Sequence, residues 1–172
     1  MTFARTAVAA ATLFALAACE MPQERITKTG QQFDVVAVTV DASRAKKTFG
    51  SAFSLEEARV EEIAQTVIRA RLESADADGA LPLAVELELE MLYLAGGAYL
   101  LLGSTTSGSR GVMRVTQQDT GAPLAAETEL AATGQKRLGG LAGIVLVKGQ
   151  ETEMARVSED YADKISAALF GE

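Results

Sequence analysis

The chain has 172 residues, of which 16 are basic, 23 are acidic and none is histidine. Its length suits one domain of ordinary size together with a targeting segment. The net charge of −7 and the lack of any long run of Lys or Arg argue against nucleic acid as a partner. Without histidine, the chain excludes Ser-His-Asp and Cys-His catalytic machinery and the common zinc sites. We therefore predict no enzyme, no cofactor and no metal site.

Residues 1–18 have the pattern of a secretory signal peptide. Arg5 supplies a positive start, and residues 7–18 are apolar except for Thr12. This apolar stretch is too short to span a bilayer as a helix. We expect it to be removed, so it is left out of the fold prediction.

The residues Leu16-Ala17-Ala18-Cys19 resemble the lipobox of bacterial lipoproteins, and Cys19 is the only cysteine of the chain. The resemblance implies cleavage between Ala18 and Cys19 and acylation of Cys19, which then anchors the protein in a membrane. Ordinary secretion is the alternative, because Ala15-Leu16-Ala17 also fits the small-x-small cleavage rule. That alternative leaves a lone thiol in an oxidising compartment, so we favour lipidation.

The location follows from the residues around the anchor. In enteric lipoproteins, an aspartate directly after the acylated cysteine favours retention in the inner membrane. Here that position holds Glu20, so this resemblance favours the outer membrane. We therefore expect a lipid-anchored envelope protein that faces the periplasm from the outer membrane. Residues 19–32 form the lipidated cysteine and a polar tether, which reaches roughly 20 Å. Loss of Arg5 with the signal peptide changes the net charge from −7 to −8.

Residues 33–172 form the single predicted domain. The β-branched run 33–40 favours a largely buried, central strand. Ser54 and Glu57 form a capping box before a helix whose apolar stripe comprises Val60, Ile63, Ala64, Val67, Ile68 and Leu72. The segment 83–93 alternates strictly, with apolar Leu83, Val85, Leu87, Leu89, Met91 and Tyr93 on one face and Glu86, Glu88 and Glu90 on the other.

A hairpin and a final helix complete the domain. Residues 111–117 and 124–132 read as strands around the turn 119–121, and the apolar positions from Met154 to Leu169 repeat with helical spacing up to Gly171. The element order is strand-helix-strand-strand-strand-helix. We therefore predict an α+β two-layer sandwich, with a mainly antiparallel sheet and two helices on one face.

With these elements, the chain resembles small envelope lipoproteins whose domain is similar to the amino-terminal domain of TolB and to the periplasmic domain of the curli secretion lipoprotein. The features that carry the resemblance are the 96–111 segment after a long strand, the hairpin turn 119–121, the glycine stretch from Gly139 and the terminal amphipathic helix. The resemblance implies partner binding and envelope assembly, and it supplies no active-site residues.

Three segments invite a chemical interpretation. The 103–110 loop has P-loop glycine spacing, but Ser109 stands where the lysine should be and a strand follows. Asp76-Ala77-Asp78-Gly79 starts like a calcium loop but lacks the later glutamate. The three glutamates 86, 88 and 90 fit a solvated strand face better than an acid/base pair, with Arg110, Arg114 or Lys136 as cross-strand partners.

The glycine-rich stretch near residue 140 is the candidate partner contact, comprising Leu138, Gly139, Gly140, Leu141 and Gly143. A tight crossover loop under the core explains it equally well. We expect a non-enzymatic scaffold or accessory subunit of a transport, secretion or outer-membrane maintenance complex, anchored through Cys19 and bound to another envelope protein. The oligomeric state is left open. The alternative is a small module that binds a lipid or hydrophobic ligand between sheet and helices.

Overall fold

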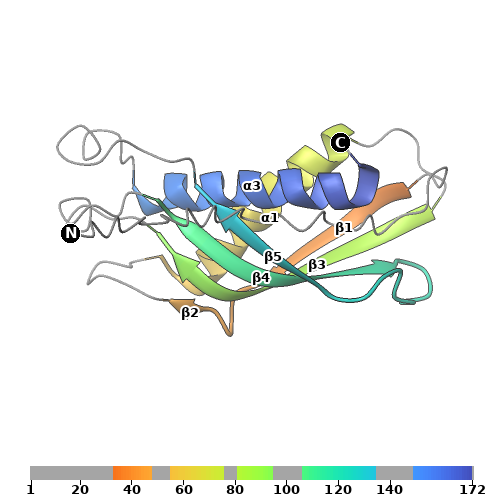
Figure 1. The fold of residues 1–172 in the computed structure, drawn as a ribbon, viewed down its shortest axis with the longest axis horizontal. Helices are drawn as coiled ribbons and strands as arrows, with labels where there is room; N and C mark the ends of the chain where they lie inside the picture. Colours follow the sequence, from red (N-terminus) through yellow and green to blue (C-terminus); the bar gives the residue numbers. More distant parts are fainter. Residues whose placement is uncertain (1–32, 48–54, 76–80, 95–105, 135–148, 172) are drawn as a thin grey trace, which may run out of the picture.

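The structure is a computed structural model that describes residues 33–47, 55–75, 81–94, 106–134 and 149–171. A single β-sheet forms one layer, and two helices form a second layer that covers one face of the sheet (Figure 1). The predicted α+β sandwich and its element order are thereby confirmed. In chain order the elements are β1 (Phe33–Asp41), β2 (Lys46–Lys47), α1 (Glu57–Ala75), β3 (Leu81–Tyr93), β4 (Gly108–Gln117), β5 (Thr128–Thr133) and α3 (Gln150–Phe170).

The sheet has the strand order β1-β3-β4-β5. The β3–β4 and β4–β5 ladders are antiparallel, whereas β1 runs parallel to β3 because α1 carries the chain back between them. The short β2, which the pattern did not predict, continues the same edge of β3 beyond β1. The prediction of a central position for the first strand is wrong: β1 lies at the edge, and it is buried on one face by α1 rather than by strands on both sides.

The core lies between the sheet and the two helices. The predicted apolar stripe of the first helix is confirmed at Val60, Ala64, Ile68 and Leu72, all fully buried. The last helix buries the positions that its periodicity predicted, and Gly171 ends it in the left-handed conformation, with φ of 79° and an N–H bonded to the Ala167 carbonyl. The largest fully buried side chains are Tyr161, Ile68, Leu72, Leu83, Leu87, Leu89, Leu92, Met113, Met154, Ile165 and Leu169.

A β-bulge in β3 changes which side chains face the core. The pairing with β4 shifts between Leu89 and Met91, so Glu90 is the extra residue. After the bulge Leu92 is buried, whereas Met91 is 45% exposed. The prediction that Met91 and Tyr93 share the buried face with Leu89 is therefore wrong. A strict alternation assumes an unbroken ladder, and one inserted residue reverses every face beyond it.

Candidate functional site

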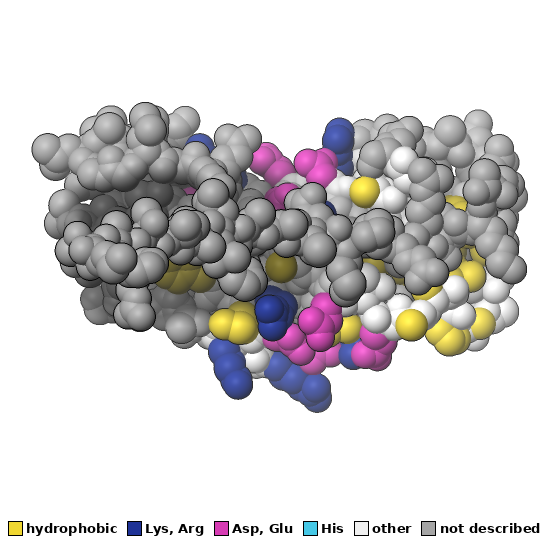
Figure 2. All heavy atoms as spheres, in the orientation of Figure 1, with side chains coloured by type: hydrophobic (Ala, Val, Ile, Leu, Met, Phe, Trp, Pro, Cys, Tyr) yellow, Lys and Arg dark blue, Asp and Glu magenta, His cyan; other side chains and the backbone are white. Residues whose placement is uncertain are grey.

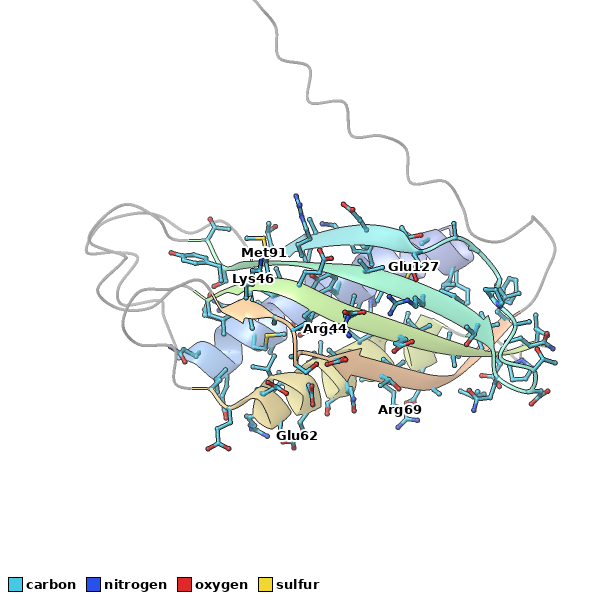
Figure 3. The ribbon with its side chains drawn as sticks, turned by 90° about the horizontal axis from the view of Figure 1, so that it is seen from below. Arg44, Lys46, Glu62, Arg69, Met91 and Glu127 are labelled. Carbon is cyan, nitrogen blue, oxygen red and sulfur yellow. The ribbon has the colours of Figure 1, made fainter. Side chains whose placement is uncertain are left out.

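The face of the sheet turned away from the helices carries a row of four alternating charges, which we call the ionic row: Arg44, Glu88, Arg114 and Glu127. Arg44 lies in the turn after β1, Glu88 on β3, Arg114 on β4 and Glu127 just before β5. Figure 3 views the molecule from this side, with Arg44 and Glu127 towards opposite borders of the sheet. The row thus crosses the sheet and joins segments far apart in the sequence.

Each neighbouring pair of the ionic row is in contact. Arg44 Nη1 lies 3.2 Å from Glu88 Oε1, and Arg114 Nη1 lies 3.0 Å from Glu88 Oε2. Arg114 Nε donates to Glu127 Oε1 at 2.7 Å. The hydrogen bonds to Glu127 and then to Glu88 raise the pKa of the Arg114 guanidinium above its ordinary value, so it stays charged at every physiological pH.

The middle of the row is more enclosed than its ends. The Glu88 and Arg114 side chains are 18% and 33% exposed, whereas those of Arg44 and Glu127 are 79% and 62% exposed. In Figure 2, basic and acidic side chains meet along the lower border, which is the sheet side of Figure 1. The end charges each have one partner within the row and a large solvent-facing surface. They remain accessible to a further charged group.

The sequence prediction of Arg114 as a cross-strand partner of the β3 glutamates is confirmed by its contact with Glu88. Arg110 instead stands opposite Met91 in the ladder. Sequence reasoning missed Arg44, which lies in a turn, and Glu127, which falls within the predicted strand 124–132 but was not assigned a cross-strand partner. Only the strand register brings them to Glu88 and Arg114.

Charged side chains from the helices cap both edges of the sheet. At β1, Glu61 Oε1 accepts the Ala42 N–H at 2.9 Å, and Arg69 Nη2 donates to the Val36 carbonyl at 3.4 Å. These two α1 side chains occupy backbone groups with which an added strand would pair.

The opposite edge is capped from α3. Asp160 Oδ2 accepts the Thr133 N–H at 2.7 Å, and Lys164 Nζ donates to the Ala131 carbonyl. Lys164 and Asp160 also pair with each other at 3.0 Å, which holds the two caps together. Both edges are therefore closed to strand addition at these positions.

Among the described residues, buried apolar side chains of the sheet and of both helices form one core between the two layers. The carboxylate of Glu153 is buried, and it accepts hydrogen bonds from the Ser107 hydroxyl at 2.9 Å and from Arg156 Nη1 at 3.2 Å. Burial raises the pKa of the Tyr161 hydroxyl above its ordinary value.

A shallow groove lies between the two helices on the far side of the molecule. It is lined by Thr66, Val67, Ala70, Arg71, Glu159 and Asp163. Arg71 Nε donates to Asp163 Oδ1 at 3.1 Å, so an ion pair bridges the groove. Its open shape and internal pairing make it a weaker candidate than the sheet face.

Several predicted site residues lie outside the described residues. They are Ala18 and Cys19 of the lipobox, Lys136, the 76–79 turn and the candidate contact Leu138, Gly139, Gly140, Leu141 and Gly143. The end of the 103–110 loop is described, and it runs into β4, as predicted. Within the described ranges, no cluster of three or more acidic, His or Cys side chains is placed to bind a metal, and neither helix is long and apolar enough to cross a membrane.

Comparison with known proteins gives likenesses of fold only. No protein-family model matches the chain, and no curated protein matches it. A solved structure described as a "putative lipoprotein" from Caulobacter crescentus is 16% identical, with 71% of this chain and 82% of that chain covered and a TM-score of 0.35. The PelC dodecamer from Paraburkholderia phytofirmans is 16% identical over 81% of this chain and 89% of that chain, with a TM-score of 0.41.

A third structure, described as an uncharacterised protein, is 13% identical and covers 83% of this chain and 96% of that chain, with a TM-score of 0.37. TM-scores below 0.5 and such low identities carry no argument about function. The functional argument therefore depends on the chain's own residues.

Proposed function

We propose that the protein is a membrane-tethered, non-enzymatic subunit of the bacterial cell envelope, which serves as a scaffold or accessory component of a transport, secretion or outer-membrane maintenance complex. The observation that carries the proposal is the open sheet face with its ionic row. It is a broad, charged and structured surface on the side of the sheet that the helices do not cover. The resemblance of Leu16 to Cys19 to a lipobox supports this proposal, because acylation of Cys19 and a polar tether up to residue 32 would hold this surface near a membrane.

The architecture favours binding over catalysis. The charged groups of the sheet face are paired with one another, and they lie on an open surface rather than in a shielded cleft where a general acid or base could be tuned. Helix side chains cap backbone groups at both edges, and an apolar core lies between the described layers, so the open face is the surface best suited to contact a partner.

Site-specific photo-crosslinking in intact cells tests this function. A photo-crosslinking amino acid in place of Met91, which is 45% exposed on the sheet face, should join the protein to a discrete envelope protein. The matched control replaces Thr66, an exposed residue on the helix layer. Crosslinks from Thr66 and none from Met91 would refute the sheet face as the contact surface.

The anchor is tested separately with Cys19→Ser. The acyl chains contribute about 0.8 kcal/mol for each buried methylene, so their loss should release the protein from the membrane fraction. Fractionation of the envelope measures this. Retention of the Cys19→Ser chain in the membrane would count against the lipobox interpretation and leave the contact surface untouched.

A further inference from the structure

The sheet presents one broad surface that no described element covers. The helices occupy one face, and side chains of α1 and α3 cap the two edges. The edges are closed to a partner at these positions, which leaves the open face as the broadest described surface of the sheet. We propose that the partner of this face is a second copy of the chain, bound face to face around a two-fold axis, with the two ionic rows running in opposite directions. The inference rests on the proposed function, because it names the partner of the same surface.

The order of charges carries the inference. Along the row the signs are positive, negative, positive and negative, from Arg44 to Glu127. The two-fold axis lies in the plane between the two faces and runs at right angles to the row through its midpoint. This axis reverses the order of charges in the second copy. Every charge then faces its opposite: Arg44 meets Glu127 of the partner subunit, and Glu88 meets Arg114 of the partner subunit. A row whose order of signs reads the same in both directions, such as positive-negative-negative-positive, would lack this self-complementarity, and so would a row with an odd number of members.

Neighbouring charges extend the same pattern. Lys46 stands opposite Met91 at the β2 edge, on the Arg44 side of the face. Glu129 stands opposite Val112 at the β5 edge, on the Glu127 side. Asp41 is also at the β1 edge, but its carboxylate accepts the Ser43 N–H at 2.8 Å. Lys46 and Glu129 thus add one positive charge beside Arg44 and one negative charge beside Glu127, and a reversed second copy would bring these opposite charges to the same ends of the row.

The size of the face suits a pair of subunits. The β3–β4 ladder has ten paired positions and the face is four strands wide. At about 3.4 Å per residue and about 4.8 Å per strand, this gives a projected area of roughly 650 Å². A stable interface buries about 800 Å² on each partner. The corrugated face, with its projecting arginines and Met91, approaches that area.

Mixed charge reversal tests the pairing directly. Two full-length copies with different affinity tags are co-expressed, crosslinked in intact envelopes, and purified through one tag while the other is quantified. Arg44→Glu in both copies sets like charges against each other at both ends of the row, and Glu127→Arg in both copies does the same. Each change should reduce recovery of the second tag about tenfold or more.

One Arg44→Glu copy combined with one Glu127→Arg copy restores both opposite-charge contacts between the subunits, so recovery should return to near the wild-type level. Each subunit in this mixture still lacks one of its own row contacts, so a merely structural role for Arg44 or Glu127 predicts no recovery. The matched control reverses the ion pair of the helix layer, with Arg71→Glu in one copy and Asp163→Arg in the other. These changes should leave wild-type recovery unaltered, singly or together.

Two results would overturn the inference. A mixed pair that recovers no better than either single reversal would refute the reversed row. Wild-type copies that never co-purify, while Met91 still crosslinks to a different envelope protein, would refute the second copy as partner and leave the proposed function standing.

Discussion

Alanine at Gly111 tests whether β3 and β4 approach each other as closely as the structure shows. A Cβ atom at position 111 would lie 2.6 Å from the Glu88 carbonyl oxygen and 3.3 Å from Leu87 Cδ1. Carbon and carbonyl oxygen ordinarily approach to about 3.3 Å, so the two strands would have to separate by about 0.7 Å. Overpacking of this kind typically costs about 1–3 kcal/mol. We expect Gly111→Ala to lower the free energy of unfolding by that amount.

The matched control is Gly108→Ala, three residues earlier on the same strand. Its added Cβ would meet the Ala132 carbonyl oxygen at 3.4 Å, an ordinary contact. Alanine at a compatible position stabilises a protein by about 0.4–1 kcal/mol, because it restricts the unfolded chain. Urea unfolding followed by circular dichroism measures both variants. A Gly111→Ala protein as stable as Gly108→Ala would refute the steric argument and the strand spacing on which it depends.

Three further changes probe the packing, the capped edge and the pH dependence. The Tyr161 hydroxyl is buried and makes no hydrogen bond to a described residue, so Tyr161→Phe should change the unfolding free energy by less than about 1 kcal/mol, whereas Tyr161→Ala should cost about 3–5 kcal/mol in urea unfolding. Replacing Asp160 and Lys164 together with alanine uncaps the β5 edge, so light scattering at elevated protein concentration should detect faster aggregation than in the wild type. The hydrogen bond from Arg59 holds the pKa of Glu151 below its ordinary value. The pair therefore stabilises the fold at pH values above the ordinary carboxyl pKa, and this stability is lost as the pH falls through the lowered pKa. Glu151→Gln should therefore flatten the acid side of the thermal-stability profile, and an unchanged slope would contradict the pairing.

Much of the fold follows from periodicity in the sequence. Both helices have apolar stripes that the structure buries, and the strict alternation of β3 correctly separates Leu87 from Glu88. Local pattern decides these elements because each has one buried and one exposed side. The edge position of β1 could not be predicted from its composition. A strand covered by a helix and a strand flanked by other strands can both be rich in β-branched residues.

The candidate site was only partly predictable. Glu88 and Arg114 could be anticipated as a cross-strand pair because both lie on alternating strands. Arg44 lies 44 positions from Glu88 in the sequence, and it reaches Glu88 only because the chain turns after β1. Met91 was predicted on the wrong face of β3 because of the bulge at Glu90. The bulge depends on how the long strand pairs and packs, and the alternation of apolar and polar residues does not reveal it.

The energetics of the ionic row connect the anchor to the proposed pairing. Exposed ion pairs contribute only about 0.2–1 kcal/mol each, so the two contacts between Arg44 and Glu127 that symmetry creates cannot by themselves hold two copies together in dilute solution. The proposed tethering to a shared membrane would change this balance, because short tethers raise the effective concentration of a second copy to about the millimolar range. A weak, self-complementary face would then suffice for two copies to associate at the membrane. Away from the membrane the two copies would separate again. Release of the chain by Cys19→Ser should therefore reduce recovery of the second tagged copy even with the row intact, and added salt should reduce it further because it screens the exposed row ends.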